Sequence, residues 1–228
     1  MRAILILDGE PTFRPYPFRP TLDGPLARAV EDATGVIDRT PAYFNGPIAF
    51  SHGISREGAI LRRAGRYAEA LVVFEEPSLA YRLGFALGVQ LFVERPEGAV
   101  LFQRRGASTG RDPLLWTASA SGGLRPDQEP RAAILADAAA EIGLAENELE
   151  GLKAIAVCAN DDTGSTLVVY YATLGENAEP TPDAARVDQL YWARQPGEVG
   201  GQVSSDTLAC WEALERWRER DGAPPIGG

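Results

Sequence analysis

Two carboxylates, Asp137 and Glu141, stand four residues apart in an alanine-rich segment, and this spacing could hold a metal ion. In an α-helix, residues at i and i+4 lie one above the other on the same face. Two anionic oxygens side by side repel each other and destabilise the helix, unless a cation lies between them. Mg²⁺ suits that position because it takes carboxylate oxygens and keeps waters and substrate phosphates as its other ligands. The spacing therefore predicts a metal-binding face on a helix.

The ends of this helix are marked by residues that commonly begin and end helices. Pro130 lacks the N–H that a first-turn residue would leave without a partner, and Gly143 can adopt the left-handed conformation that closes a helix. Upstream, Gly122 and Gly123 predict a turn followed by a loop. The sequence thus predicts a glycine turn, a loop and a short helix that carries both carboxylates.

A solvent-facing position is the competing interpretation of the carboxylate pair. The buried stripe of the predicted helix consists of four residues, namely Ile134, Leu135, Ala138 and Ile142. Glu141 then lies at the edge of the stripe and Asp137 further round. An edge position suits ligands that point into a cleft, and it also suits surface carboxylates. The glycine turn and the strands predicted around it favour the metal-binding interpretation.

The same segment resembles a degenerate Nudix box, for which the family pattern is G-x5-E-x7-R-E-U-x-E-E-x-G-U, with U a bulky aliphatic residue. Gly123 and Glu129 match the front of the pattern, and residues 141–144 match its final E-x-G-U. The chain is one residue short between the two halves. When the back is aligned, the R-E pair becomes Ala136-Asp137 and the E-E pair becomes Ala140-Glu141. The resemblance therefore implies that one helix carboxylate is shortened to Asp and another is lost.

Predicted strands surround the box in the order that is typical of the Nudix family. Residues 89–95 and 99–105 are apolar runs on either side of a Pro-Glu-Gly turn, which predicts a hairpin. Residues 154–160 and 166–172 predict a second strand pair downstream. The resemblance covers residues ~86 to ~195. It implies an α/β fold, a Nudix-type α/β/α sandwich with a mixed sheet, to which a small N-terminal α+β domain is added.

The resemblance implies hydrolysis of a nucleoside diphosphate that is linked to another moiety, such as a nucleotide sugar or an ADP-ribose-like compound. It makes Asp137 and Glu141 both the catalytic residues and the ligands of Mg²⁺, with Mn²⁺ as an alternative ion. The substrate-binding residues that it implies are Arg104, Arg105, Gly122 and Gly123. Adjacent residues of a strand point to opposite faces, so at most one of the two arginines can reach the pocket.

Two further functional interpretations stay open. Ala140 stands where the family places a metal ligand, and the arginine of the box is missing at Ala136. These departures favour a catalytically degenerate Nudix-fold module that binds a nucleotide-like ligand or a protein. An interaction protein that works through residues 1–85 is the third interpretation.

The chain divides into an N-terminal α+β extension at 1–85, a Nudix-like domain at 86–220 and a tail at 221–228. In the extension, we predict strands near 1–8, 46–54 and 58–63, a helix from Leu26 that ends at Gly35, and a helix or strand at 67–74. The run Phe44-Asn45-Gly46-Pro47, followed by a strand pair, is loosely similar to a Nudix subgroup that cleaves nucleotide sugars such as UDP-glucose. A C-terminal helix at 204–218 has an apolar stripe of Leu208, Trp211, Leu214 and Trp217.

Composition limits the partners. The chain has 228 residues, of which 45% are hydrophobic and 24% charged, as is ordinary for a globular protein. Its net charge of −10 excludes nucleic acid as a direct partner, because no basic stripe could neutralise a phosphate backbone. We expect no membrane association, a cytoplasmic location and free thiols at Cys158 and Cys210. Nudix proteins are often dimers, so the resemblance also allows a homodimer.

Overall fold

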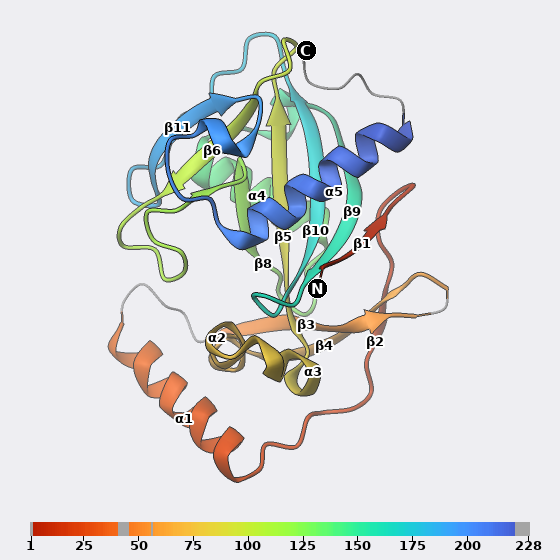
Figure 1. Ribbon diagram of the computed structural model, residues 1–228, viewed down its shortest axis with the longest axis vertical. Coiled ribbons are helices and arrows are strands. Elements are labelled where there is room, and N and C mark those ends of the chain that lie inside the picture. The colour runs from red at the N-terminus through yellow and green to blue at the C-terminus, as the bar shows by residue number, and fades with distance from the viewer. Residues whose placement is uncertain (1, 41–45, 56, 222–228) are drawn as a thin grey trace.

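Strands from both halves of the chain join in one mixed sheet in the computed structural model, which describes residues 2–40, 46–55 and 57–221 (Figure 1). Along its main path, the order is β1-β9-β10-β5-β3-β4-β2. These strands are β1 (Arg2–Ile6), β2 (Phe13–Pro15), β3 (Pro47–Ile54), β4 (Ile60–Arg66), β5 (Phe85–Glu94), β9 (Leu149–Asn160) and β10 (Ser165–Leu174). The β5–β10 and β2–β4 pairs are parallel, whereas the other pairs along this path are antiparallel.

The predicted hairpin before the box is present, but its two strands separate at once. The strands β5 and β6 (Val100–Arg105) pair at a single position, where Glu94 lies opposite Val100. Beyond that point β6 pairs with β7 (Trp116–Thr117) and β11 (Val187–Ala193), whereas β5 pairs with β8 (Ala120–Gly123). This separation leaves room between β5 and β6 for a site.

Two helices cover the opposite faces of the sheet, which confirms the predicted α/β/α sandwich (Figure 1). The box helix is α4 (Pro130–Ile142), and it buries Ile134, Ala138 and Ile142 against the core on one face. On the other face, α5 (Ser205–Asp221) buries Trp211 and Leu214. The predicted stripe of α5 is wrong at one position, because Leu208 is 39% exposed and Ala209 and Ala213 face the sheet in its place.

Both predicted ends of α4 are confirmed. Pro130 occupies the first turn, and Gly143 closes the helix with a φ of 68°. The backbone of Thr181 runs so close to Gly143 that a Cβ there would lie 3.1 Å from the Thr181 carbonyl oxygen. Backbone N–H groups of Thr181 and Asp183 donate to the last carbonyl oxygens of α4 at 2.8 and 3.0 Å. The segment before β11 is thereby fixed beside the two carboxylates.

The N-terminal part adds three helices at one end of the sheet: α1 (Gly24–Arg39), α2 (Tyr67–Glu75) and α3 (Ala80–Leu83) (Figure 1). The predicted end of the first helix is wrong, since α1 continues past Gly35 for another turn and buries Ile37. A single glycine inside a helix costs only about 1 kcal/mol, which burial of an apolar residue offsets. Short 3₁₀ helices lie at η1 (Pro77–Leu79), η2 (Glu146–Glu148) and η3 (Pro196–Glu198).

Sheet pairing crosses the predicted boundary at residue 85. The first strand, β1, pairs with β9, and β3 pairs with β5 through Phe50 and Ala86. The division into an extension and a Nudix-like domain therefore stays a prediction from sequence. The predicted tail begins one residue too early, because Asp221 is the last residue of α5. Residues 222–228 and the Phe44-Asn45 portion of the subgroup pattern lie outside the described residues.

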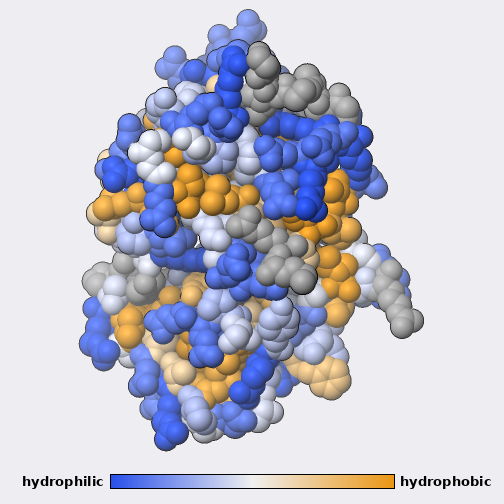
Figure 2. Space-filling view, viewed as in Figure 1, coloured by the Kyte–Doolittle hydropathy of each residue, from blue (hydrophilic) through white to orange (hydrophobic). Residues whose placement is uncertain are grey.

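The surface carries the charge that the composition requires. On the face drawn in Figure 2, hydrophilic residues cover most of the area and apolar residues form separate patches. Cys158 and Cys210 are both buried, and no disulfide joins them. Within 2–40, 46–55 and 57–221, no helix has the length and apolar character needed to cross a bilayer.

Candidate active site

Glu141 lies in the last turn of α4 and is 8% exposed. Its Oε2 accepts two hydrogen bonds from neutral donors, one from Nε2 of Gln103 at 2.7 Å and one from the backbone N–H of Ser121 at 3.1 Å. Burial raises the pKa of Glu141, and these two hydrogen bonds oppose that effect. The predicted position at the edge of the buried stripe is therefore wrong, because β6 and β8 both contribute partners that enclose this side chain.

Asp137 lies one turn earlier on the same face, half-buried against the glycine turn. A Cβ on Gly122 would lie 2.8 Å from Cγ of Asp137, so only glycine leaves room for this carboxylate. The pKa of Asp137 is raised to about 7. Burial is the larger cause, and the negative charge of Glu141 is the second. Arg186, Arg105 and Arg125 oppose the shift. The two acids are thus close enough to interact, as their spacing predicted.

No ion pair joins either carboxylate to another described residue. The nearby arginines are held elsewhere: Arg186 approaches Asp183 at 3.5 Å, and Nε of Arg105 donates to the carbonyl oxygen of Arg111 at 2.8 Å. They lie within range to favour the charged form of Asp137 without neutralising it. A buried and a half-buried acid without a cationic partner among the described residues are energetically costly, so their presence indicates a site that is completed by a cation or a proton.

The residues around the acids fit a hard divalent cation. Glu141 and Asp137 offer carboxylate oxygens, and among the described residues the buried Oε1 atoms of Gln90 and Gln103 have no hydrogen-bond partner. Within the described ranges, no three His, Cys, Asp or Glu side chains lie close enough together to hold a metal ion between them. Mg²⁺ fits such a sparse set, because it commonly takes one or two carboxylates and fills its other positions with water and substrate phosphate.

A pocket of about 150 Å³ opens where β5 and β6 separate. Its floor is built from Gly88 and Gln90 of β5 and from Ser121, Gly122 and Gly123 of β8. A Cβ on Gly88 would lie 2.7 Å from the carbonyl oxygen of Gly122, so the close approach of these strands requires glycine. The acids do not line this pocket, but Ser121 bonds Glu141 and Gly122 packs on Asp137. The pocket and the acids therefore share the β8 backbone.

Arg104 and Arg105 point in different directions, as the strand geometry predicted. The Arg105 side chain lines the pocket, and its charge acts on both Asp137 and Glu141. On the opposite side of β6, Arg104 pairs with Asp188 at 3.1 Å and donates to the carbonyl oxygen of Leu114. Of the predicted site residues, Asp137, Glu141, Arg105, Gly122 and Gly123 therefore lie close together. Arg104 lies away from them.

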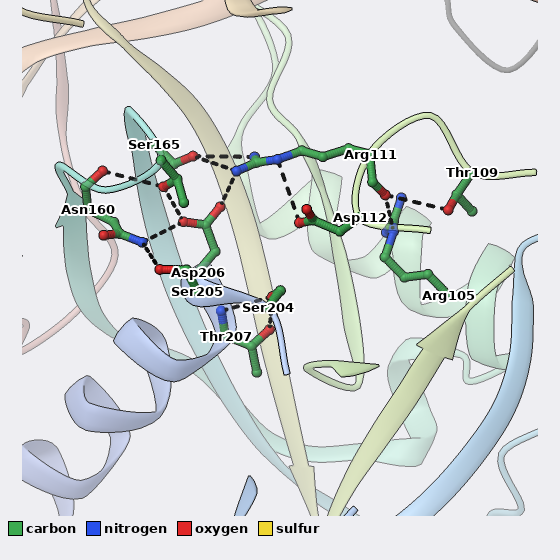
Figure 3. A network of polar contacts seen from close by, with 11 residues as sticks. Arg105, Thr109, Arg111, Asp112, Asn160, Ser165, Ser204, Ser205, Asp206 and Thr207 are labelled. Carbon is green, nitrogen blue, oxygen red and sulfur yellow. Dashed lines mark hydrogen bonds and ion pairs between the residues drawn. The ribbon is translucent and has the colours of Figure 1, made fainter. Parts of the chain in front are cut away.

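A second arginine, Arg111 in the loop after β6, also lines the pocket, and Figure 3 shows its guanidinium directed toward Ser165 and Asp206. The guanidinium of Arg111 donates to Asp206 at 2.8 Å and to Oγ of Ser165 at 3.3 Å, and it lies 3.8 Å from the centre of the Phe74 ring. Asp206 belongs to the first turn of α5. Arg111 therefore joins the N-terminal part, the strand β10 and the helix α5 at the rim of the pocket.

Sequence reasoning missed several residues that shape the site: Gln90, Gln103, Arg186, Asp206 and the ring of Phe74. A period-two pattern assigns Gln103 to the same face of β6 as Arg105, which is the one signal that could have identified it. The others are brought to the site by contacts between distant segments.

No protein-family model matches the sequence. A protein of Nocardia farcinica named isopentenyl-diphosphate Delta-isomerase is 31% identical over 156 residues, which is 66% of this chain and 85% of that protein. The solved structure of DR0079 from Deinococcus radiodurans has a TM-score of 0.52 and 16% identity over 75% of this chain and 98% of its own.

Solved Nudix structures also match the chain. The Nudix domain of NrtR from Shewanella oneidensis, crystallised with ADP ribose, has a TM-score of 0.47 and 17% identity over 60% of this chain and 88% of its own. The MutT Nudix hydrolase from Burkholderia pseudomallei has a TM-score of 0.45 and 17% identity, over 57% of this chain and 97% of its own.

The similarity to the Nocardia protein covers 85% of that protein at 31% identity. The chain therefore belongs to the same family as this Nocardia relative, and it shares its fold with the Deinococcus structure.

Proposed function

We propose that the chain is a divalent-metal-dependent hydrolase that cleaves the phosphoanhydride bond of an organic diphosphate, with a nucleoside diphosphate joined to a sugar or another moiety as its substrate class. The observation that carries this proposal is the buried pair Asp137 and Glu141, which has no ion-pair partner among the described residues and lies within the field of three arginines. The resemblance of the glycine turn and α4 to a degenerate Nudix box supports the reaction type.

Asp137 and Glu141 would hold Mg²⁺ or Mn²⁺, and a backbone carbonyl of Gly122 or Gly123 is a suitable additional oxygen. When bound, such an ion supplies positive charge to the diphosphate oxygens and lowers the pKa of a water molecule. Fewer anionic anchors than the family pattern provides imply weaker metal binding, with more water in the coordination sphere.

The other residues of the site would bind the phosphates and orient the acids. Arg105 presents a guanidinium to the pocket, and this group can bind phosphate oxygens through two parallel hydrogen bonds. Gln103 and the N–H of Ser121 hold Oε2 of Glu141 in one direction. Asp137 has a pKa of about 7, so a carboxylate oxygen there can accept a proton near neutral pH.

Isomerisation of a short alkyl diphosphate is a second candidate, because the Nocardia relative is named isopentenyl-diphosphate Delta-isomerase. The same acids could move a proton between carbon atoms of a bound substrate. Cys158 of β9 and Cys210 of α5 are both buried in the core between α5 and the sheet, so carboxyl groups would serve as the acid and the base of this reaction.

The deciding experiment incubates purified protein with Mg²⁺ and a panel of UDP-glucose, ADP-ribose and isopentenyl diphosphate. Magnesium-dependent release of nucleoside monophosphate from either nucleotide supports the hydrolase. Conversion of isopentenyl diphosphate to its allylic isomer without phosphate release supports the second candidate. If no compound reacts at high protein concentration while calorimetry detects chelator-insensitive binding, the catalytically degenerate module is the correct interpretation and the hydrolase proposal fails.

A further inference from the structure

We propose that the N-terminal part of the chain forms one wall of the substrate site, and that this wall admits only a small polar group, no larger than a single sugar ring, beyond the diphosphate. The inference rests on the proposed function, because Arg105 joins the pocket to the acids. It predicts that a sugar attached to a nucleoside diphosphate is accepted, whereas a second nucleoside in the same position is excluded.

The wall is fixed directly to the glycine turn of the box. The backbone N–H of Ala49 in β3 donates to the carbonyl oxygen of Leu124 at 2.7 Å. The side chain of Ile48 covers Gly123 so closely that a Cβ there would lie 3.2 Å from Cδ1 of the isoleucine. Because β3 also pairs with β5 in the central sheet, the wall cannot move away without breaking these contacts.

Aromatic rings from α2 form the rest of the wall. Phe74 and Tyr67 both line the pocket, and their rings pack edge to face with centroids 6.5 Å apart. The Phe74 ring also lies 3.8 Å from the guanidinium carbon of Arg111, which Asp206 and Ser165 hold in place. Stacking on an immobilised guanidinium restricts the ring to one position. The wall is therefore held at β3 by the glycine turn and at Phe74 by Arg111.

The size and polarity of the pocket determine what fits. Its volume of about 150 Å³ is well below the roughly 300–1,000 Å³ of pockets that enclose drug-sized ligands. At its floor, Gln90 is 4% exposed and its Oε1 atom has no hydrogen-bond partner among the described residues. A hydroxyl of a small ligand would donate to that oxygen and remove the cost of leaving it unpaired. These features favour a sugar-sized group that carries hydroxyls.

The test compares UDP-glucose with diadenosine diphosphate, in which nucleosides flank both phosphates. We expect kcat/KM of the natural protein to favour UDP-glucose by at least ~100-fold. Phe74→Leu, which opens the wall, should reduce this ratio at least ~10-fold, chiefly by lowering KM for the dinucleotide. Gln90→Leu, which removes the acceptor, should raise KM for UDP-glucose about 10-fold.

Tyr81→Leu is the matched control, because Tyr81 is an aromatic residue of the same part that is 70% exposed and does not line this pocket. It should leave the ratio unchanged. Equal use of both compounds by the natural protein would overturn the inference, as would an equal shift in Tyr81→Leu. Thermal unfolding checks each variant, and Ile48→Ala replaces Phe74→Leu if the latter does not fold.

Calorimetry separates this inference from the proposed function. If neither compound is hydrolysed, the proposed function fails, but titration with the same two compounds still tests the wall. Binding of UDP-glucose without binding of diadenosine diphosphate supports it. Equal binding of both compounds, or binding of neither, contradicts it.

Discussion

Two carboxylate sites, Asp206 on α5 and the pair Asp137 and Glu141 on α4, differ in how their negative charge is compensated. Asp206, in the first turn of α5, accepts hydrogen bonds from Arg111 at 2.8 Å, Asn160 at 2.9 Å and Thr163 at 2.5 Å (Figure 3). Among the residues that the structure describes, the hydrogen bonds to Glu141, in the last turn of α4, come only from the neutral donors Gln103 and Ser121. One site is neutralised from within the chain, and the other is not.

The helices increase this contrast. A carboxylate at a helix N-terminus is stabilised by the helix dipole, whereas one near the C-terminus is destabilised. Asp206 lies at the favourable end of α5, and Glu141 lies at the unfavourable end of α4 with Asp137 one turn before it. The Asp206 cluster therefore has the properties of a structural joint, whereas the pair on α4 is left without a cationic partner among the described residues, as the proposed metal site requires.

The largest expected effect is on stability, at the neutralised site. We expect Asp206→Ala to lower the free energy of unfolding by about 3–5 kcal/mol, because it leaves the guanidinium of Arg111 without its buried partner. Urea denaturation measures this change. Asp188→Ala is the control, since its pair with Arg104 is exposed and should contribute less than about 1 kcal/mol. Equal losses in the two variants would contradict the structural role of the Asp206 cluster.

At the other site, the expected effect is on activity. Glu141→Gln keeps the shape of the side chain but removes its charge, so we expect kcat to fall about 10²–10³-fold while the free energy of unfolding without metal stays constant or rises. Steady-state kinetics and urea denaturation measure the two effects. Glu150→Gln, at an exposed position of β9, should change neither. A Glu141→Gln protein that is destabilised yet fully active would make the two carboxylate sites alike.

The dependence of stability on pH sharpens the comparison further. The folded protein holds a proton on Asp137 up to a pKa of about 7, whereas the ordinary value is 3.8. Between these values the folded state binds more protons than the unfolded state, so stability falls as pH rises. With chelator present, we expect the free energy of unfolding relative to Asp137→Asn to fall by about 1–3 kcal/mol between pH 4 and pH 8. Urea denaturation at each pH measures it, and a difference that stays constant with pH would contradict the raised pKa of Asp137, which burial and the charge of Glu141 cause.

The features that the sequence predicted correctly depend on local residues. Pro130 and Gly143 determine the ends of α4, and the i, i+4 spacing places Asp137 above Glu141, since helix geometry alone decides both. Strand alternation separated Arg104 from Arg105 in the same way. These inferences need no knowledge of what packs against each element.

The features that could not be predicted depend on contacts between distant segments. Arg111 and Asp206 are 95 residues apart in the chain, and no local pattern links them. The burial of Glu141 depends on how closely β6 and β8 approach α4, which a helical wheel cannot describe. The contribution of Phe74 to the pocket follows from the docking of the N-terminal helices, and the sequence left open whether residues 67–74 form a helix or a strand.

The smallest expected effect comes from restoring the carboxylate that the box lacks. Ala140 is half-buried and adjacent to Glu141, so Ala140→Glu adds a third anion beside the pair. We expect the affinity for Mn²⁺ or Mg²⁺ to increase about 10-fold, measured by calorimetry. Without metal, the added repulsion should lower stability by about 1 kcal/mol, and metal should restore it. Ala139→Glu, at an exposed neighbouring position, is the control and should change neither quantity. If both variants bind metal as the natural protein does, the cation lies away from this end of α4, and the two carboxylate sites would differ in charge compensation without differing in metal binding.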